Sequence, residues 1–138
     1  MHDRPHRDRL VDRVDPDVLG GQLAHERQLS VDDLLADVPQ VRTPCVDPTN
    51  EHVFHAYTLR VERRDELQAR LQREGIGTAV YYPIPLHLQK CFSHLGYKLG
   101  QLPEAERAAG EVLSLPIYPE LARPQLDYVI DAIRGFYR

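Results

Sequence analysis

The sequence contains only two cysteines, Cys45 and Cys91. They lie far apart in the chain and form no Cys-x-x-Cys motif. A disulfide framework requires more and closer cysteines than these, particularly in a reducing compartment. We therefore expect both residues to be reduced thiols without a structural role.

Long apolar runs are also missing. No stretch approaches the about 20 apolar residues of a membrane-spanning helix, and the charged N-terminus lacks the apolar region of a signal peptide. The formal charge is −4, and acidic residues are interspersed with basic ones throughout the chain. Nucleic-acid binding needs clustered Lys and Arg. We therefore expect a cytoplasmic protein that binds neither nucleic acid nor membrane.

The 138 residues are enough for one domain with a modest core. The first 30 residues differ from the rest, because arginines alternate with aspartates and Pro5 and Pro16 interrupt any long helix. We predict that residues 1–30 are poorly ordered and that residues 31–138 form the folded domain. A short helix is predicted over residues 22–36.

The first half of the predicted domain reads as strand, helix, strand. Residues 52–61 are rich in β-formers with a period of two, which places five residues on one face: Val53, His55, Tyr57, Leu59 and Val61. Residues 63–74 predict a helix with Leu67 and Leu71 one turn apart on the same side. Residues 76–82 predict a second strand.

The second half begins with a loop over residues 83–87, which Pro83 and Pro85 make stiff. Apolar residues then recur at helical spacing from Pro103 to Leu113. A short strand is predicted over residues 115–118. The last predicted helix runs from Pro124 to the C-terminus, with one apolar face: Leu126, Val129, Ile130, Ile133 and Tyr137. This order predicts an α+β fold, a small mixed sheet of about three strands packed with helices.

Together, four stretches resemble the small domain of the DegT/DnrJ/StrS sugar aminotransferases, which use pyridoxal phosphate and share the aspartate-aminotransferase fold (fold type I). They recur in the family's order and spacing over about a hundred residues, a span that makes the match specific. The four stretches are residues 52–57, 75–89, 103–107 and 113–119.

The resemblance implies an aminotransferase of amino-sugar or polysaccharide biosynthesis. Such an enzyme moves an amino group, usually from glutamate, to a keto-sugar attached to a nucleotide, and the full-length protein is expected to be a homodimer. Its cofactor is held as a Schiff base on a lysine. The only lysines are Lys90 and Lys98, and neither lies in the Ser-rich context of the family's lysine.

We therefore expect that this chain does not bind pyridoxal phosphate covalently and contains no catalytic residue. We also expect that residues 31–138 are the small domain alone and that the large, cofactor-binding domain is absent from this chain. The abrupt change of character near residue 30 leads us to expect the product of a truncated or frame-disrupted gene.

The resemblance assigns substrate binding to His87 and Tyr82. In the family, the proline loop lies beside the active site and its His and aromatic residues shape the sugar-nucleotide pocket. Pro83 and Pro85 reduce the freedom of the unbound loop, so closure over a substrate loses little entropy.

Other interpretations remain open at this stage. The chain could be a non-enzymatic binding or assembly module, whose exposed apolar face would need a partner. A metal module would use His87, Cys91 and His94, whose spacing would align them on one helix but matches no common zinc site. We expect His55 to face the core rather than to bind a metal with His52. The acidic residues at helix starts are interpreted as structural, since carboxylates there favour the helix dipole: Asp65, Glu66, Glu104 and Glu106.

Overall fold

The computed structural model describes residues 31–50, 52, 54–118 and 120–138. Residues 1–30, which the sequence predicts to be poorly ordered, lie outside this part, as does most of the helix predicted over residues 22–36. The described part contains the end of that predicted helix, and residues 31–35 are helical.

The sheet has three strands, β1 (Val41–Arg42), β2 (Tyr57–Val61) and β3 (Val112–Leu115), in the order β1-β2-β3. Both pairs are antiparallel. The predicted α+β fold with a small sheet of about three strands is confirmed, although the sheet is antiparallel rather than mixed.

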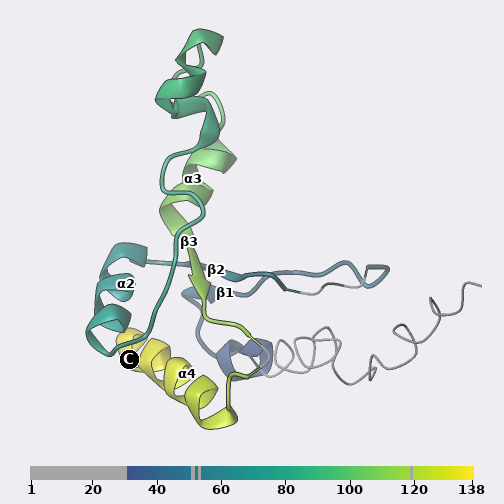
Figure 1. Cartoon of the computed structure of the whole chain (residues 1–138), viewed down its shortest axis with the longest axis vertical. Helices are drawn as coiled ribbons and strands as arrows, with labels where there is room; N and C mark the ends of the chain where they lie inside the picture. The colour runs from purple at the N-terminus through teal and green to yellow at the C-terminus, as the bar shows by residue number, and fades with distance from the viewer. Residues whose placement is uncertain (1–30, 51, 53, 119) are drawn as a thin grey trace, which may run out of the picture.

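Two helices form the body of the molecule with the sheet, α2 (Arg64–Arg73) and α4 (Arg123–Tyr137). Figure 1 shows them lying together below β2 and β3. The predicted apolar faces are confirmed, and five side chains of this core have no exposed surface: Leu59, Leu67, Leu71, Leu113 and Ile133. Burial of this kind is the main stabilising contribution in a domain of this size.

The residue before helix α4 is Ala122, which has no side-chain oxygen to cap the helix, whereas Ser, Thr, Asp or Asn is usual at this position. The amide of Ala122 instead donates to Oε1 of Gln125 at 2.9 Å. This is the reciprocal half of a capping box, so one terminal donor is satisfied from inside the helix.

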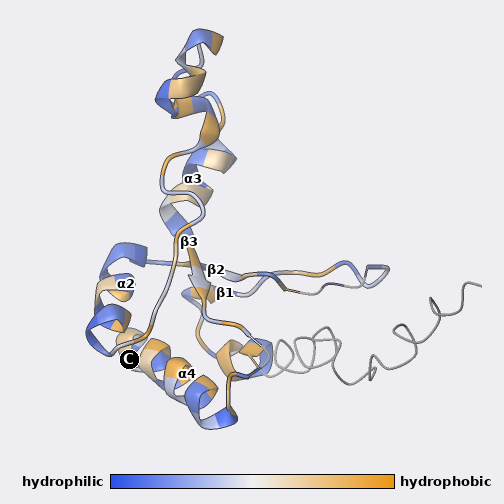
Figure 2. Cartoon of the chain, in the orientation of Figure 1, coloured by the Kyte–Doolittle hydropathy of each residue, from blue (hydrophilic) through white to orange (hydrophobic). Residues whose placement is uncertain are grey.

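A long projection, here called the arm, consists of residues 81–111. It contains the 3₁₀ helices η2 (Leu86–Leu88) and η3 (Lys90–Leu95) and the helix α3 (Pro103–Glu111). Figure 1 shows the arm standing away from the sheet and the two body helices. Hydrophobic residues recur along it, as they do along α4 (Figure 2).

Two predicted strands differ from the observed ones. The strand predicted over residues 76–82 is reduced to one bridge, in which Ala79 and Ser114 exchange both backbone hydrogen bonds, at 3.1 and 2.7 Å. Beyond Ala79 the chain leaves the sheet for the arm. The strand predicted over residues 115–118 lies earlier, at Val112–Leu115, because Pro116 has no amide donor for the ladder.

Candidate functional site

A cleft of about 360 Å³ lies at the end of the sheet where Tyr57 pairs with Leu115. Three of the four stretches that carry the family resemblance meet here. The lining residues are His55, Ala56, Gly77, Thr78, Ala79, Tyr81, Ser114, Leu115, Pro116, Ile117 and Tyr118. None of them is Asp, Glu, Lys or Arg, and the polar groups are imidazole and hydroxyls. The cleft therefore suits hydrogen bonding and ring contacts with a polar, uncharged group.

His55 is exposed and lines the cleft, so the prediction that it faces the core is wrong. The strand predicted over residues 52–61 is shorter in the structure at its N-terminal end. Strand β2 begins only at Tyr57, and the chain bends at His55 and Ala56. Just before the bend, Phe54 is 5% exposed and adopts a left-handed φ of 44°. Alternation of side chains holds only within a regular strand, so it could not place His55.

Ser114 forms the floor of the cleft. It is 4% exposed, and its Oγ lies 2.8 Å from Oγ1 of Thr58 on the neighbouring strand. Its backbone is held by Ala79 as described above. A buried hydroxyl with a partner is the low-energy arrangement, so this floor is a fixed surface.

Tyr81 and Tyr82 lie at the start of the arm. Their side chains are 58% and 62% exposed, and their rings meet edge to face at 6.0 Å between centroids. Tyr81 lines the cleft, whereas Tyr82, the residue predicted from the sequence, does not. Both tyrosines present ring surface and a hydroxyl without being packed into the core.

His87 lies within the arm, outside the lining of the cleft. Its side chain is only 5% exposed, and its Nε2 lies 3.0 Å from Oε1 of Glu106 in α3. The ring of Tyr97 meets it edge to face at 6.1 Å. The proline loop is therefore fixed to α3 through a buried histidine. Direct contact between His87 and a substrate would require the Glu106 contact to open.

Glu106 connects three parts of the arm. Besides His87, its carboxylate accepts hydrogen bonds from the amides of Gly100, at 2.8 Å, and Leu102, at 3.3 Å. The Gly100 amide, followed by His87 and Leu102, lowers the pKa of Glu106 below its usual 4.5, and partial desolvation opposes this. The structural interpretation of Glu106 is confirmed, since it also lies in the first turn of α3.

The three residues of the possible metal site do not share a helical face. His87 belongs to η2, whereas Cys91 and His94 belong to η3, and the extended backbone of Gln89 separates the two. Nδ1 of His94 lies 3.2 Å from the backbone oxygen of Cys91. Among the described residues, no group of three His, Cys, Asp or Glu side chains is arranged to hold a metal ion.

Lys90 and Lys98 are both exposed on the arm, and neither lines the cleft. A Schiff base needs a lysine amine within reach of the cofactor in its site. The residues present around the cleft therefore do not fit pyridoxal phosphate bound as a Schiff base by this chain alone.

The three-stranded antiparallel sheet with its helices is the small-domain fold of the aminotransferases. The solved structure of S. venezuelae DesV, in complex with a ketimine intermediate, matches it with a TM-score of 0.82 at 39% identity, over 86% of this chain and 32% of that chain.

The chain belongs to the DegT/DnrJ/EryC1/StrS aminotransferase family, whose model matches residues 24–134. It is 41% identical over 128 residues to the dTDP-3-amino-3,4,6-trideoxy-alpha-D-glucose transaminase of Micromonospora megalomicea subsp. nigra, covering 91% of this chain and 34% of the relative. It is 63% identical over 87 residues to a pleiotropic regulatory protein of Geobacillus stearothermophilus, covering 63% of this chain and 23% of the relative. The chain thus spans between 23% and 34% of the length of these relatives. The family uses pyridoxal phosphate.

No helix in the described part of the chain is long and apolar enough to cross a membrane.

Proposed function

We propose that this chain is the substrate-side, small-domain part of a pyridoxal-phosphate-dependent aminotransferase that acts on a nucleotide-linked keto-sugar, with glutamate as the usual amino donor. The observation that carries the proposal is the meeting of three family-like stretches at one cleft, which is lined by hydroxyls, an imidazole and tyrosine rings. Such groups recognise sugar hydroxyls. The Micromonospora relative is a transaminase named for a dTDP-linked amino sugar, which supports the same substrate class.

Within this proposal the two predicted substrate residues take different parts. Tyr82 is exposed and meets Tyr81, which lines the cleft, and it contacts the part of the substrate that extends from the cleft. His87 acts on the substrate side by fixing the proline loop through Glu106. A preorganised loop loses less entropy when a substrate binds.

The cofactor supplies an electron sink for the amino group when it is bound. We propose that the lysine that anchors the cofactor belongs to a part of the full-length protein outside this chain. We also propose that the full-length protein assembles as a homodimer. The isolated chain is then inactive. After incubation with pyridoxal phosphate we expect no aldimine absorbance and no borohydride-stable adduct. A stoichiometric adduct on Lys90 or Lys98 would contradict this proposal.

A chimera tests the substrate role directly. Residues 31–138 would replace the matching segment of the Micromonospora transaminase, which aligns with most of this chain. We expect transamination of that enzyme's own substrate class to survive, and Tyr82→Ala to lower kcat/KM by about tenfold or more. Tyr128→Ala is the matched control, because this tyrosine is also exposed, at 53%, but lies on α4 beside another pocket, whereas Tyr82 meets the cleft residue Tyr81. A folded chimera without activity, or an equal loss in both variants, would count against the proposal.

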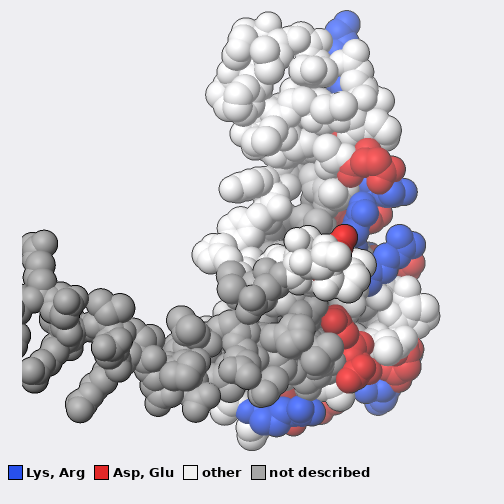
Figure 3. All heavy atoms as spheres, turned by 90° about the vertical axis from the view of Figure 1, so that its right-hand side faces the viewer, with Lys and Arg blue, Asp and Glu red and all other residues white. Residues whose placement is uncertain are grey.

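A second candidate function, an assembly module, is favoured by the surface of the arm. Of the ten exposed large apolar side chains among the described residues, eight lie between Tyr81 and Leu102. This segment contains two lysines and no acidic residue, and Figure 3 shows the upper part of the molecule almost without charge. Surfaces of this kind are normally covered. The occupant we propose is the cofactor-binding part of the family's fold.

Sedimentation velocity distinguishes this candidate. The chain mixed with the complementary segment of the Micromonospora transaminase should sediment as one complex, and Leu99→Asp in the arm should prevent complex formation. Monomeric behaviour of the mixture at micromolar concentration would exclude the arm as an assembly surface.

A further inference from the structure

Two arginines lie directly opposite each other on the sheet. Arg42 of β1 pairs in register with Arg60 of β2. Residues opposite each other in an antiparallel pair project to the same face and are close neighbours, so like charges there are destabilising. The neighbouring pair, Val41 and Val61, is buried in the core, which places both arginines on the other face.

The guanidinium of Arg60 is incompletely paired. Its Nε and Nη2 are buried and have no hydrogen-bond partner among the described residues. Nε lies 3.0 Å from Oε2 of Glu111, but its N–H does not point at that oxygen, so this contact is an ion pair without a hydrogen bond. The side chain of Arg42 makes no hydrogen bond or ion pair with any residue that the structure describes. Buried donors left unpaired are costly, and a bound water or ion usually accounts for them.

Both arginines line a pocket of about 330 Å³, together with Arg63. The carboxylates of Glu62 and Glu111 also line it, and Arg63 is already bound by Glu66. What the pocket offers an anion is the guanidinium of Arg42 and the unsatisfied donors of Arg60.

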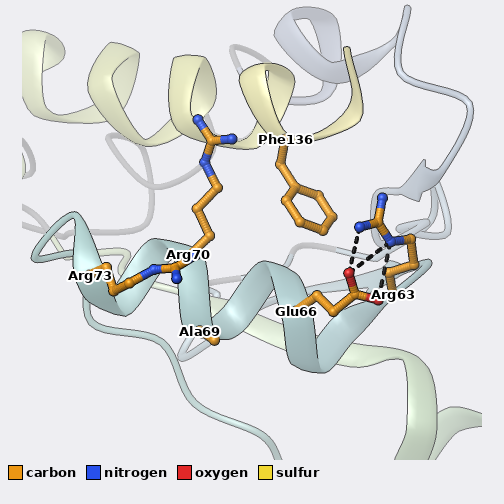
Figure 4. A pocket seen from close by; sticks show the side chains of 6 residues that line it. All are labelled: Arg63, Glu66, Ala69, Arg70, Arg73 and Phe136. Atoms are coloured by element: carbon orange, nitrogen blue, oxygen red, sulfur yellow. Dashed lines mark hydrogen bonds and ion pairs between the residues drawn. The ribbon is translucent and has the colours of Figure 1, made fainter.

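A neighbouring pocket of about 530 Å³ is also rich in arginine, but two of its three arginines are paired; Figure 4 shows the pair of Arg63 with Glu66. Arg63 is bound by Glu66, and Nε of Arg70 lies 3.0 Å from Oε1 of Glu74. Only Arg73 of this pocket makes no ion pair within the described part of the chain. The larger pocket therefore offers less to an anion than the smaller one.

We propose that Arg42 and Arg60 bind a phosphate group, either inorganic phosphate or the phosphomonoester of a small metabolite. Phosphate accepts hydrogen bonds from several guanidinium groups at once, and it would separate the two like charges. The site lies at the end of the sheet where Arg60 pairs with Val112, whereas the cleft lies at the end where Tyr57 pairs with Leu115. It is therefore a second site that does not depend on the proposed transaminase role.

Phosphate titration of the full chain tests the proposal in a phosphate-free, low-chloride buffer. With ¹⁵N-labelled arginine, the Nε–H resonance of Arg60 should shift saturably. Arg42→Gln should weaken binding by about tenfold. Arg73→Gln removes the same charge from the neighbouring pocket and should change binding by less than about twofold.

Glu111→Gln should change phosphate affinity in the direction opposite to that of Arg42→Gln. It removes the carboxylate that competes with phosphate for Arg60, so binding should become tighter. Glycerol phosphate identifies the source of the group, because tighter binding than inorganic phosphate indicates a metabolite ester and equal binding indicates the free ion. The proposal is overturned if Arg60 shows no saturable shift, if Glu111→Gln leaves affinity unchanged, or if Arg73→Gln is as harmful as Arg42→Gln. Should Arg42→Gln unfold, the Arg60 and Arg73 shifts of the unaltered protein decide.

Discussion

Replacing His87 by Ala should loosen the arm without unfolding the body of the molecule. The side chain of His87 is 5% exposed and contacts the carboxylate of Glu106 at 3.0 Å. A hydrogen bond to a charged group contributes about 1.5–3 kcal/mol, which corresponds to about ten- to hundredfold in an opening equilibrium. Because the arm stands away from the sheet (Figure 1), we expect this loss to appear as local opening.

Hydrogen exchange measures this opening at single residues. The amides of Gly100 and Leu102, which donate to Glu106, should exchange about ten- to hundredfold faster in His87→Ala. Amides of β2 should be unaffected. His94→Ala is the matched control, because His94 lies on the same arm and is exposed. Unchanged exchange in His87→Ala, or equal acceleration in the control, would refute the structural role of His87.

The pH dependence of the same amides gives an independent check. The folded pKa of Glu106 lies below its usual value of 4.5, chiefly because the Gly100 amide donates to it. The charged form therefore stabilises the arm above pH 4.5, and this contribution is lost as the pH falls through the folded pKa. Protection of the arm should decrease in that acid range before the body unfolds, and Glu106→Gln should remove the dependence.

Three further predictions concern the body. Leu71→Ala should lower the free energy of unfolding, measured in denaturant melts, by about 2–5 kcal/mol, because Leu71 is 0% exposed. The control Leu99→Ala should change it by less than about 0.5 kcal/mol, because Leu99 is 77% exposed. Tyr57→Phe should cost about 1–2 kcal/mol, because its buried hydroxyl donates to Asp32; an unchanged melting midpoint would show that this bond contributes nothing. Burial raises the pKa of Tyr137 from 10.0 to about 12, so its stabilising contribution is complete below pH 10 and is lost as the pH rises through about 12; Tyr137→Phe should remove that alkaline slope.

Much of the body followed from spacing alone. The alternation of Tyr57, Leu59 and Val61 predicted a strand with one buried face, and all three are buried. The spacing of Leu67 and Leu71 predicted the inner side of α2 in the same way. Such patterns work because a core-facing side chain recurs with the period of its own element.

The candidate site was predicted only in part. The proline loop and Tyr82 were assigned to substrate from their sequence, and that assignment stays a prediction because neither lines the cleft. Tyr81, Thr78 and Tyr118, which do line it, were not assigned to substrate. The only sequence evidence for these residues was that they lie in the family-like stretches. That evidence does not distinguish residues that line a cleft from residues that pack in the core.

By itself, the sequence determined the family, the order of β2, α2, α3, β3 and α4, and the apolar faces of β2, α2 and α4. These features rest on patterns within short stretches of the chain. The tertiary structure alone decided the surroundings of His55 and His87 and the opposition of Arg42 and Arg60. The partner of His87 is 19 residues away in the sequence, and the two arginines meet only through strand register. Bends and strand register depend on how distant segments pack, so they cannot be predicted from the spacing of residues within one element.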